Sequence, residues 1–223
     1  MKTRLIINPN TTESVTDRLL TVARGIQRNE FPSDVTTLLS ATASFGGSYI
    51  SDEVGYAIGG HATLEAWRRV CETGSTPSAA LIGCFGDPGL WALREMSGVP
   101  VTGLAEASFI EASQHGAFAV VTGGARWKPM LERLAGALDF ANQMQTIHTI
   151  EATGAQLAAD PEAAIVLLGE ACAAVARQAN VRSIILGGAG LAGYAAKIAA
   201  ASPALGVPLI DSAEAGARRL LQL

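Results

Sequence analysis

Residues 81–90, "LIGCFGDPGL", join an apolar run to a turn rich in glycine, aspartate and proline. The run ends near Cys84, which is one of three cysteines in the chain. A strand that is apolar along its whole length is typical of a parallel sheet covered by helices on both faces. Ligands of such open sheets bind beyond the carboxyl ends of the strands. The stretch therefore predicts an α/β fold in which Cys84 closes its strand beside a binding crevice.

The same alternation of short apolar runs and longer helical stretches continues through the 223 residues. Each apolar run is followed by a helical one, which is the pattern of a parallel sheet built from strand–helix–strand units. We expect strands over residues 3–9, 33–41, 78–85, 98–104, 118–124, 144–152, 181–188 and 206–212.

Two long stretches resemble each other and indicate two related halves. The first begins at Ala80 and the second at Ser183. Each has a strand, a Gly-rich turn, a helix, the tripeptide "GVP", a further strand and a helix that opens on "AEA". This pattern predicts two pseudo-symmetric α/β domains, each with a parallel sheet. The predicted domains are residues 1–99 with 207–223, and residues 100–206.

The composition excludes several classes of function. Hydrophobic residues make up 49% of the chain and the net charge is −4, so a large core is expected and a nucleic-acid partner is not. No apolar run approaches the roughly 20 residues of a membrane helix, and the apolar stretch at the N-terminus is too short for a secretory signal. We expect a cytoplasmic protein. Three cysteines without a C-x-x-C pair argue against a disulfide framework and a zinc site.

The turn after Cys84 offers two interpretations. Residues 86–90, "GDPGL", begin a helix with Pro88 at an early position, and the free amides and dipole there favour an anion or a thiolate. A carboxylate substrate would bind beside the thiol on those amides. The alternative is a buried, unreactive thiol, since free cysteine is among the most buried residue types.

Polar residues gather where the first strand ends. Asn8, Asn10, Thr11 and Thr12 follow one another in "NPNTT", and Thr122 ends the corresponding strand of the second half. Such residues commonly cap the following helix. They also suit the binding of a substrate amide or carboxylate, because they lie at the same edge of the sheet as Cys84.

A dinucleotide fingerprint is present near the C-terminus. Residues 188–193, "GAGLAG", match G-x-G-x-x-G, and Asp211 follows at about the distance of a ribose-binding acid. Only 12 residues follow Asp211, which is too few to continue a nucleotide-binding half, and the first copy of the repeat lacks the motif. Small residues also suit a tight turn beside any small ligand. We therefore disfavour a dinucleotide cofactor.

Four segments carry a resemblance to a known family. "LIINPNTT" (5–12), "YISDEVGYAIGGHATLEAW" (49–67), "GCFGDPGL" (83–90) and "ILGGAGLAG" (185–193) together resemble the hydantoin racemases of the aspartate/glutamate racemase superfamily. The resemblance spans nearly the whole chain, with the motifs in the same order. It implies an active site in the cleft between two α/β domains, and no cofactor or metal.

The resemblance also implies a pair of cysteines, one in each half, that act on opposite faces of a carbon acid. The first falls on Cys84. The second falls on position 188, where this chain has Gly188. Arylmalonate decarboxylases, which belong to the same superfamily, resemble this chain in having a single cysteine, although theirs lies in the second half.

We therefore expect a cofactor-independent racemase or isomerase in which Cys84 acts through a thiolate on an enediolate-like intermediate. A decarboxylase of a malonate-like acid and an inactive binder of small ligands are the alternatives, and a homo-oligomer is expected. By resemblance, Asn8 assists catalysis. The predicted substrate-binding residues are Asn10, Thr11, Tyr49, Ile50, Phe85, Gly86, Thr122, Gly123, Gly188 and Ala189.

Overall fold

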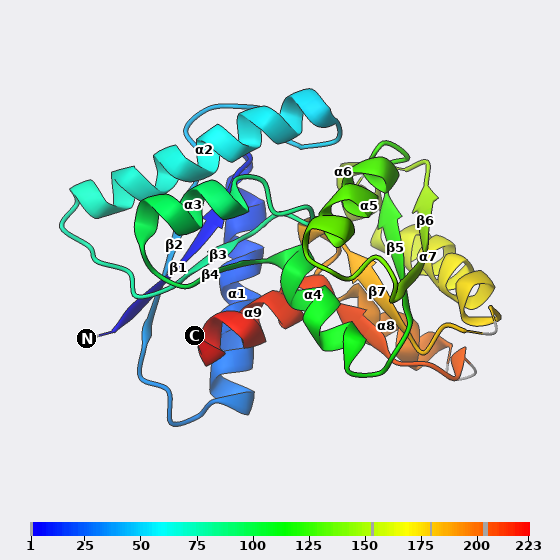
Figure 1. The fold of residues 1–223 in the computed structure, drawn as a ribbon. Coiled ribbons are helices and arrows are strands. Elements are labelled where there is room, and N and C mark those ends of the chain that lie inside the picture. Colours follow the sequence, from blue (N-terminus) through cyan, green and yellow to red (C-terminus); the bar gives the residue numbers. More distant parts are fainter. Residues whose placement is uncertain (1, 153, 179, 203–204) are drawn as a thin grey trace.

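The computed structural model describes residues 2–152, 154–178, 180–202 and 205–223, so residues 203 and 204 of the second repeat lie outside the described part. Two four-stranded sheets lie side by side, each flanked by helices (Figure 1). The strand orders are β2-β1-β3-β4 and β6-β5-β7-β8, and every pairing is parallel. The predicted α/β class with two similar sheets is confirmed.

The first sheet and its helices come from the N-terminal part of the chain. The strands are β1 (Thr3–Asn8), β2 (Thr37–Thr42), β3 (Ala80–Ile82) and β4 (Val101–Gly103), and the helices are α1 (Glu13–Glu30), α2 (Glu53–Glu72), α3 (Leu90–Ser97) and α4 (Leu104–Ser113). β3 ends at Ile82, before Cys84, because its neighbour β4 ends opposite it at Gly103. Cys84 therefore lies in the β3–α3 loop rather than at the end of the strand.

The second sheet repeats this arrangement. Its strands are β5 (Phe118–Gly123), β6 (Met144–Ile150), β7 (Ser183–Gly187) and β8 (Leu209–Asp211). The helices are α5 (Trp127–Ala137), α6 (Gly154–Ala159), α7 (Pro161–Ala176), the 3₁₀ turn η1 (Ala189–Leu191), α8 (Tyr194–Ala201) and α9 (Ser212–Gln222). The sequence patterns did not predict α6.

The pairing of two short strands corrects the predicted domain ranges. β4 pairs with β3 in the first sheet, although its residues fall in the predicted second domain. β8 pairs with β7 in the second sheet, although its residues were assigned to the first domain. The physical reason is that a strand–helix–strand unit places its second strand beside its first, and the predicted boundaries cut through two such units.

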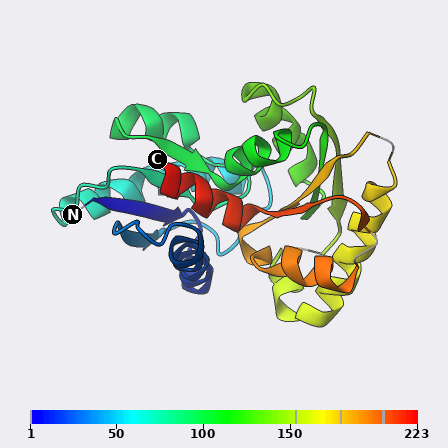
Figure 2. The ribbon, with the colours of Figure 1, turned by 90° about the horizontal axis from the view of Figure 1, so that it is seen from below.

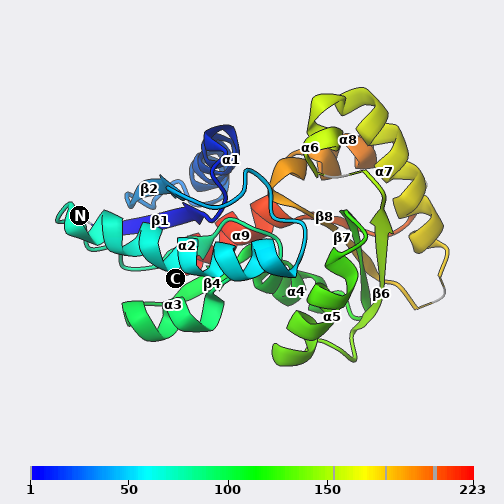
Figure 3. The same ribbon diagram turned by 90° about the horizontal axis from the view of Figure 1, so that it is seen from above.

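One hydrophobic core joins the two halves. α9 runs between the sheets and packs against α1 and α4 (Figures 2 and 3). A single buried cluster includes Leu81 of the first sheet, Ile185 of the second, Phe109 of α4 and Leu220 of α9. The sheets are therefore fixed relative to each other by apolar contacts, which are the main source of stability in such folds. No helix in the described ranges has the length and apolar character needed to span a bilayer.

Two buried carboxylates connect the loops of the central strands to neighbouring helices. The carboxylate of Asp87, in the β3–α3 loop, accepts hydrogen bonds from the amides of Ala105 and Glu106 at the start of α4 (2.9 and 2.8 Å). The carboxylate of Asp211, at the end of β8, accepts one from the amide of Gly193 in front of α8 (2.6 Å) and caps α9. Each carboxylate thus holds the loop that follows a central strand.

The pKa values of these two carboxyl groups predict how the stability of the fold depends on pH. Burial raises the pKa of Asp87 to about 7 and that of Asp211 to about 6. Because these values lie above those of the unfolded chain, the folded state binds more protons between about pH 4 and pH 7, and stability falls as pH rises. We expect the free energy of unfolding to be about 3–5 kcal/mol lower near pH 7.5 than near pH 4.5.

Denaturant titrations of three proteins check this expectation. Asp87→Asn removes one titrating group and should flatten the pH dependence, whatever it does to stability at a single pH. Asp17→Asn, at an exposed position on α1, is the matched control and should keep the wild-type slope. An equally steep fall in Asp87→Asn and in the wild type would contradict the assignment.

Candidate active site

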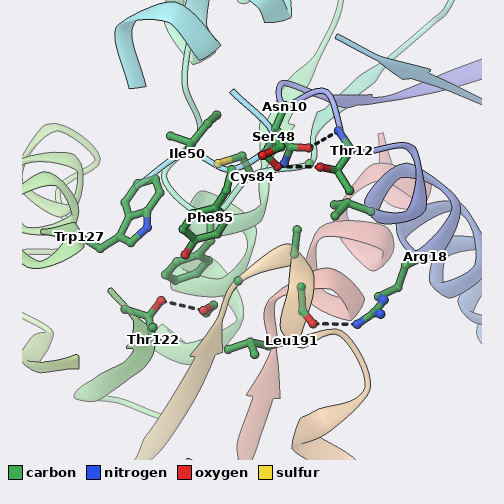
Figure 4. A pocket seen from close by; sticks show the side chains of 18 of the residues that line it. Asn10, Thr12, Arg18, Ser48, Ile50, Cys84, Phe85, Thr122, Trp127 and Leu191 are labelled. Atoms are coloured by element: carbon green, nitrogen blue, oxygen red, sulfur yellow. Dashed lines mark hydrogen bonds between the residues drawn. The ribbon is translucent and has the colours of Figure 1, made fainter. Parts of the chain in front are cut away.

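A pocket of about 300 Å³ opens where the carboxyl ends of the two sheets meet (Figure 4). It is bordered by the loops after β1, β2, β3 and β7, and by the first turns of α1 and α5. Its lining consists of Asn10, Thr12, Ser14, Val15, Arg18, Ser48, Tyr49, Ile50, Gly83, Cys84, Phe85, Thr122, Gly123, Trp127, Gly187, Gly188, Ala189, Gly190 and Leu191. The predicted crevice beside Cys84 therefore exists.

The Cys84 thiol borders this pocket and is otherwise enclosed, with 8% of the residue exposed. Burial raises the pKa of the thiol well above its usual value, and the negative charge of Asp87 raises it further. The expectation that the loop favours the thiolate is therefore wrong. α3 begins only at Leu90, with Gly89 as its N-cap, and the nearest charge in the loop is a carboxylate. The resting group is a protonated thiol.

Gly188 occupies the position that corresponds to Cys84 in the second half. Cys84 precedes Gly89, and Gly188 precedes Gly193, by the same number of residues, and both later glycines are left-handed N-caps of the next helix. Gly188 itself has φ +143°, a conformation that residues with a side chain rarely adopt. Its amide donates a hydrogen bond to Ser212 Oγ (3.1 Å), so this N–H does not face a ligand.

Two aromatic rings hold the halves together beside the pocket. The Phe85 ring lies so close to Gly187 that a Cβ there would come within 2.3 Å of it. The Trp127 ring covers Gly86 in the same way, at 2.4 Å. Gly86 therefore packs against Trp127 and is not part of the pocket lining, contrary to the prediction. The absence of side chains at both glycines lets the β3–α3 loop reach the second sheet.

A hydrogen-bond network orients Asn10 at the end of β1. The Asn8 side chain is fully buried, and its Nδ2 donates to Asn10 Oδ1 (3.0 Å) and Thr16 Oγ1 (3.1 Å). Asn10 Oδ1 also accepts from the amide of Thr12 (2.9 Å). The oxygen of Asn10 is thus occupied, and its Nδ2 is left to donate toward the pocket. Asn8 does not line the pocket, so it supports Asn10 rather than touching a substrate.

Most of the predicted site residues meet at this pocket. Those that line it are Asn10, Tyr49, Ile50, Cys84, Phe85, Thr122, Gly123, Gly188 and Ala189. Thr11 does not, since its amide donates to the Gly47 carbonyl and the residue lies outside the lining. The sequence reasoning named Thr12, which also lines the pocket, but missed Ser14, Val15, Arg18, Ser48, Gly83, Trp127, Gly187, Gly190 and Leu191. The available signal was the position of Ser14 and Val15 in the first turn after "NPNTT", with Arg18 one helical turn later.

The pocket is nearly free of charge. Among the lining residues that the structure describes, Arg18 is the one with a fixed charge. Thr122 Oγ1 donates to the Gly187 carbonyl (2.8 Å) and Thr12 Oγ1 to the Ser48 carbonyl (2.7 Å), so these hydroxyls offer acceptor lone pairs to a ligand. Asp211 is occupied by backbone amides and lies outside the pocket lining, which leaves the dinucleotide fingerprint without its ribose-binding acid.

Several known proteins are similar to this chain in sequence or in fold. A hydantoin racemase from Pseudomonas sp. (strain NS671) is 32% identical over 214 residues, which cover 96% of this chain and 82% of that protein. A hydantoin racemase from Paenarthrobacter aurescens is 31% identical over 220 residues, with 96% and 87% covered. The structure of an allantoin racemase from Klebsiella pneumoniae superposes with a TM-score of 0.89 and 27% identity, over 100% of this chain and 87% of that one.

A more distant likeness concerns the fold alone. A variant of arylmalonate decarboxylase superposes with a TM-score of 0.69 at 20% identity, over 99% of this chain and 93% of that one. The family model described as Asp/Glu/Hydantoin racemase matches residues 5–220. This match covers nearly the whole chain and includes both sheets and the pocket between them. The chain belongs to the Asp/Glu/hydantoin racemase family.

Proposed function

We propose that this protein is a cofactor-independent racemase or isomerase of a small cyclic carbon acid of the hydantoin type, with Cys84 as the group that moves the proton. The observation that carries the proposal is that Cys84 and Gly188 occupy equivalent positions on one pocket. A carbon atom placed between them has a thiol on one face only. The names of the relatives, hydantoin racemase and allantoin racemase, support the class of substrate.

The chemistry begins when the Cys84 thiol loses its proton to solvent, a step that its raised pKa makes costly. The thiolate removes the proton from a carbon next to a carbonyl group, and the electron pair of that C–H bond moves onto the carbonyl oxygen as an enediolate-like anion. Donors aimed at this oxygen lower the barrier. Asn10 Nδ2 is oriented for that role by its hydrogen-bonded oxygen. After the Sγ–H proton has been replaced by one from solvent, transfer of this proton from Cys84 Sγ to the carbon completes the exchange on the same face.

The part of the lining that would surround the reacting carbon suits a neutral ring better than a dicarboxylate. Near Cys84 it offers an amide donor from Asn10 and hydroxyl acceptors from Thr12 and Thr122. A cyclic ureide presents alternating N–H donors and carbonyl acceptors, which can pair with these groups. Buried polar groups need such partners, so a ring without them is bound less well.

The second face lacks a protein acid at position 188. Inversion then requires that the anion receives its proton from solvent on the side of Gly188. Because the Cys84 thiol is protonated at rest, the first proton transfer becomes faster as pH rises and more thiolate forms. Exchange on the Cys84 face is therefore the intrinsic activity of this pocket, and inversion is the slower outcome.

A decarboxylase of a malonate-like acid is the second candidate. It is favoured by one observation, the protonated state of the single thiol in an enclosed position. Loss of carbon dioxide would form the anion without a base, and Cys84 would then deliver its proton to one face. Release of carbon dioxide from a disubstituted malonate separates this activity from racemisation.

Substitution of Cys84 tests the proposal. Cys84→Ser should lower kcat/KM for racemisation of a 5-substituted hydantoin about 10²- to 10⁴-fold, since the alcohol is a far weaker acid than the thiol and forms almost no alkoxide to act as the base. Loss of optical rotation measures the rate. Cys71→Ser is the matched control, because Cys71 lies on α2 away from the pocket lining. Full activity in Cys84→Ser would rule out the thiol as the proton-transferring group.

A thiol introduced at position 188 tests whether the pocket has a proton-transferring group on one face of the substrate only. Gly188→Cys should racemise the hydantoin on the order of 10-fold faster than Gly188→Ala, because it supplies an acid and base on the second face. Both variants should lose about 1–3 kcal/mol of stability, since the backbone at Gly188 has φ +143°. The new Cβ itself meets Leu191 at ordinary contact distances of 3.4–3.5 Å. Equal rates in the two variants would show that position 188 does not face the reacting carbon.

A further inference from the structure

Arg18 lies at the end of the pocket formed by α1, on the opposite side from Trp127 (Figure 4). Its guanidinium reaches across from the first half, and Nη1 donates to the carbonyl of Gly190 in the second (2.8 Å). This hydrogen bond fixes the head group beside the pocket. It uses one of the five N–H donors of a guanidinium.

No carboxylate in the described part of the chain pairs with this guanidinium. The other arginines near the interface between the halves have such partners, for example Arg133 with Glu53 and Arg126 with Asp52. Glu13 and Asp17, the acidic residues nearest to Arg18 on α1, are exposed and do not line the pocket. The charge of Arg18 is therefore available to an anion that enters the pocket.

The start of α1 adds to this positive end. α1 is 18 residues long, and its N-cap Thr12 makes no side-chain capping hydrogen bond, because its hydroxyl donates to the Ser48 carbonyl. The amide of Val15 donates to the Thr12 carbonyl (3.1 Å), and the amides before it have no partners within the helix and carry partial positive charge. Ser14, in this first turn, lines the pocket beside Arg18. Arg18 and the helix terminus thus favour negative charge at the same place.

The pocket consequently has two different ends. The end at Trp127 is apolar and aromatic, the middle at Cys84 is neutral, and the end at α1 is positive. A substrate whose reacting carbon lies beside Cys84 directs its substituent along this axis. The substituent that pairs with Arg18 is one that carries a carboxylate.

We infer that Arg18, with the first turn of α1, binds a carboxylate on the substituent of the substrate, so that the preferred substrates are hydantoins with an acidic side chain. The inference rests on the proposed function and makes Arg18 a residue that determines specificity. The carboxylate and guanidinium form charge-assisted hydrogen bonds, which are about twice as strong as neutral ones.

A pair of isosteric substrates tests the inference. One is 5-(2-carboxyethyl)hydantoin and the other is its carboxamide, which differs only in charge. We expect the wild type to favour the acid by on the order of 10-fold in kcat/KM, and Arg18→Gln to lower this preference by about 10-fold, to near unity, mainly through KM. Arg24→Gln, an exposed position on the same helix, makes the same change of charge and should keep the wild-type preference.

Two results would overturn the inference. The first is a wild type that does not distinguish the acid from the amide. The second is an Arg18→Gln variant that loses the same factor with both substrates, which would mean that Arg18 only holds the Gly190 loop. If neither hydantoin is racemised, the proposed function fails, and calorimetric binding of the same pair tests Arg18 separately. Tighter binding of the acid that Arg18→Gln abolishes supports the inference, and equal binding of acid and amide overturns it.

Discussion

Close contact between aromatic rings and glycine backbones at the junction of the two sheets is the constraint on which the site depends. Phe85 extends from the β3–α3 loop onto Gly187, and Trp127 extends from α5 onto Gly86. Neither glycine has room for a Cβ. The contacts bring the carboxyl ends of two separate sheets to one pocket, so that groups from both halves surround the same ligand. Without this approach Cys84 would face solvent or the core.

Two halves of one topology have become chemically different at this junction. The first half supplies the thiol of Cys84, the carboxylate of Asp87 behind it, and the amide of Asn10. At the positions that correspond to Cys84 and Asp87, the second half has Gly188 and Leu191. In the proposed function, proton transfer is therefore concentrated on one side of the pocket. In the proposed function, the other side shapes the pocket and admits solvent.

The fold class was predictable because short apolar runs alternate with helical stretches and because the two related stretches can be recognised in the sequence. The sheets to which β4 and β8 belong were not predictable. Strands of three residues carry little signal in the sequence, and their pairing is decided by tertiary contacts. Cys84 was correctly placed at the pocket. The raised pKa of its thiol was not predictable, because it comes first from burial of the side chain and then from the carboxylate of Asp87, which the loop turns inward with φ 54°.

The site residues that were wrongly predicted from the sequence were wrong for a similar reason. Asn8 and Asn10 look alike in the sequence, but the chain buries Asn8 under α1 and turns Asn10 toward the pocket. Arg18 follows Ser14 by one helical turn, but it is the packing of α1 beside η1 that brings this face of the helix to the pocket. Local patterns locate the edge of a sheet where a ligand binds, whereas the direction of each side chain depends on the partners that the tertiary structure brings to it.

The central claim is that one thiol serves one face of the substrate. Deuterium exchange at the reacting carbon of each separate hydantoin enantiomer in D₂O, followed by NMR together with optical rotation, tests it most directly. The account predicts that one enantiomer gains deuterium faster than it loses rotation, and that Cys84→Ser abolishes this difference. Exchange that always accompanies inversion, in both enantiomers, would show two opposed proton-transferring groups and contradict the account.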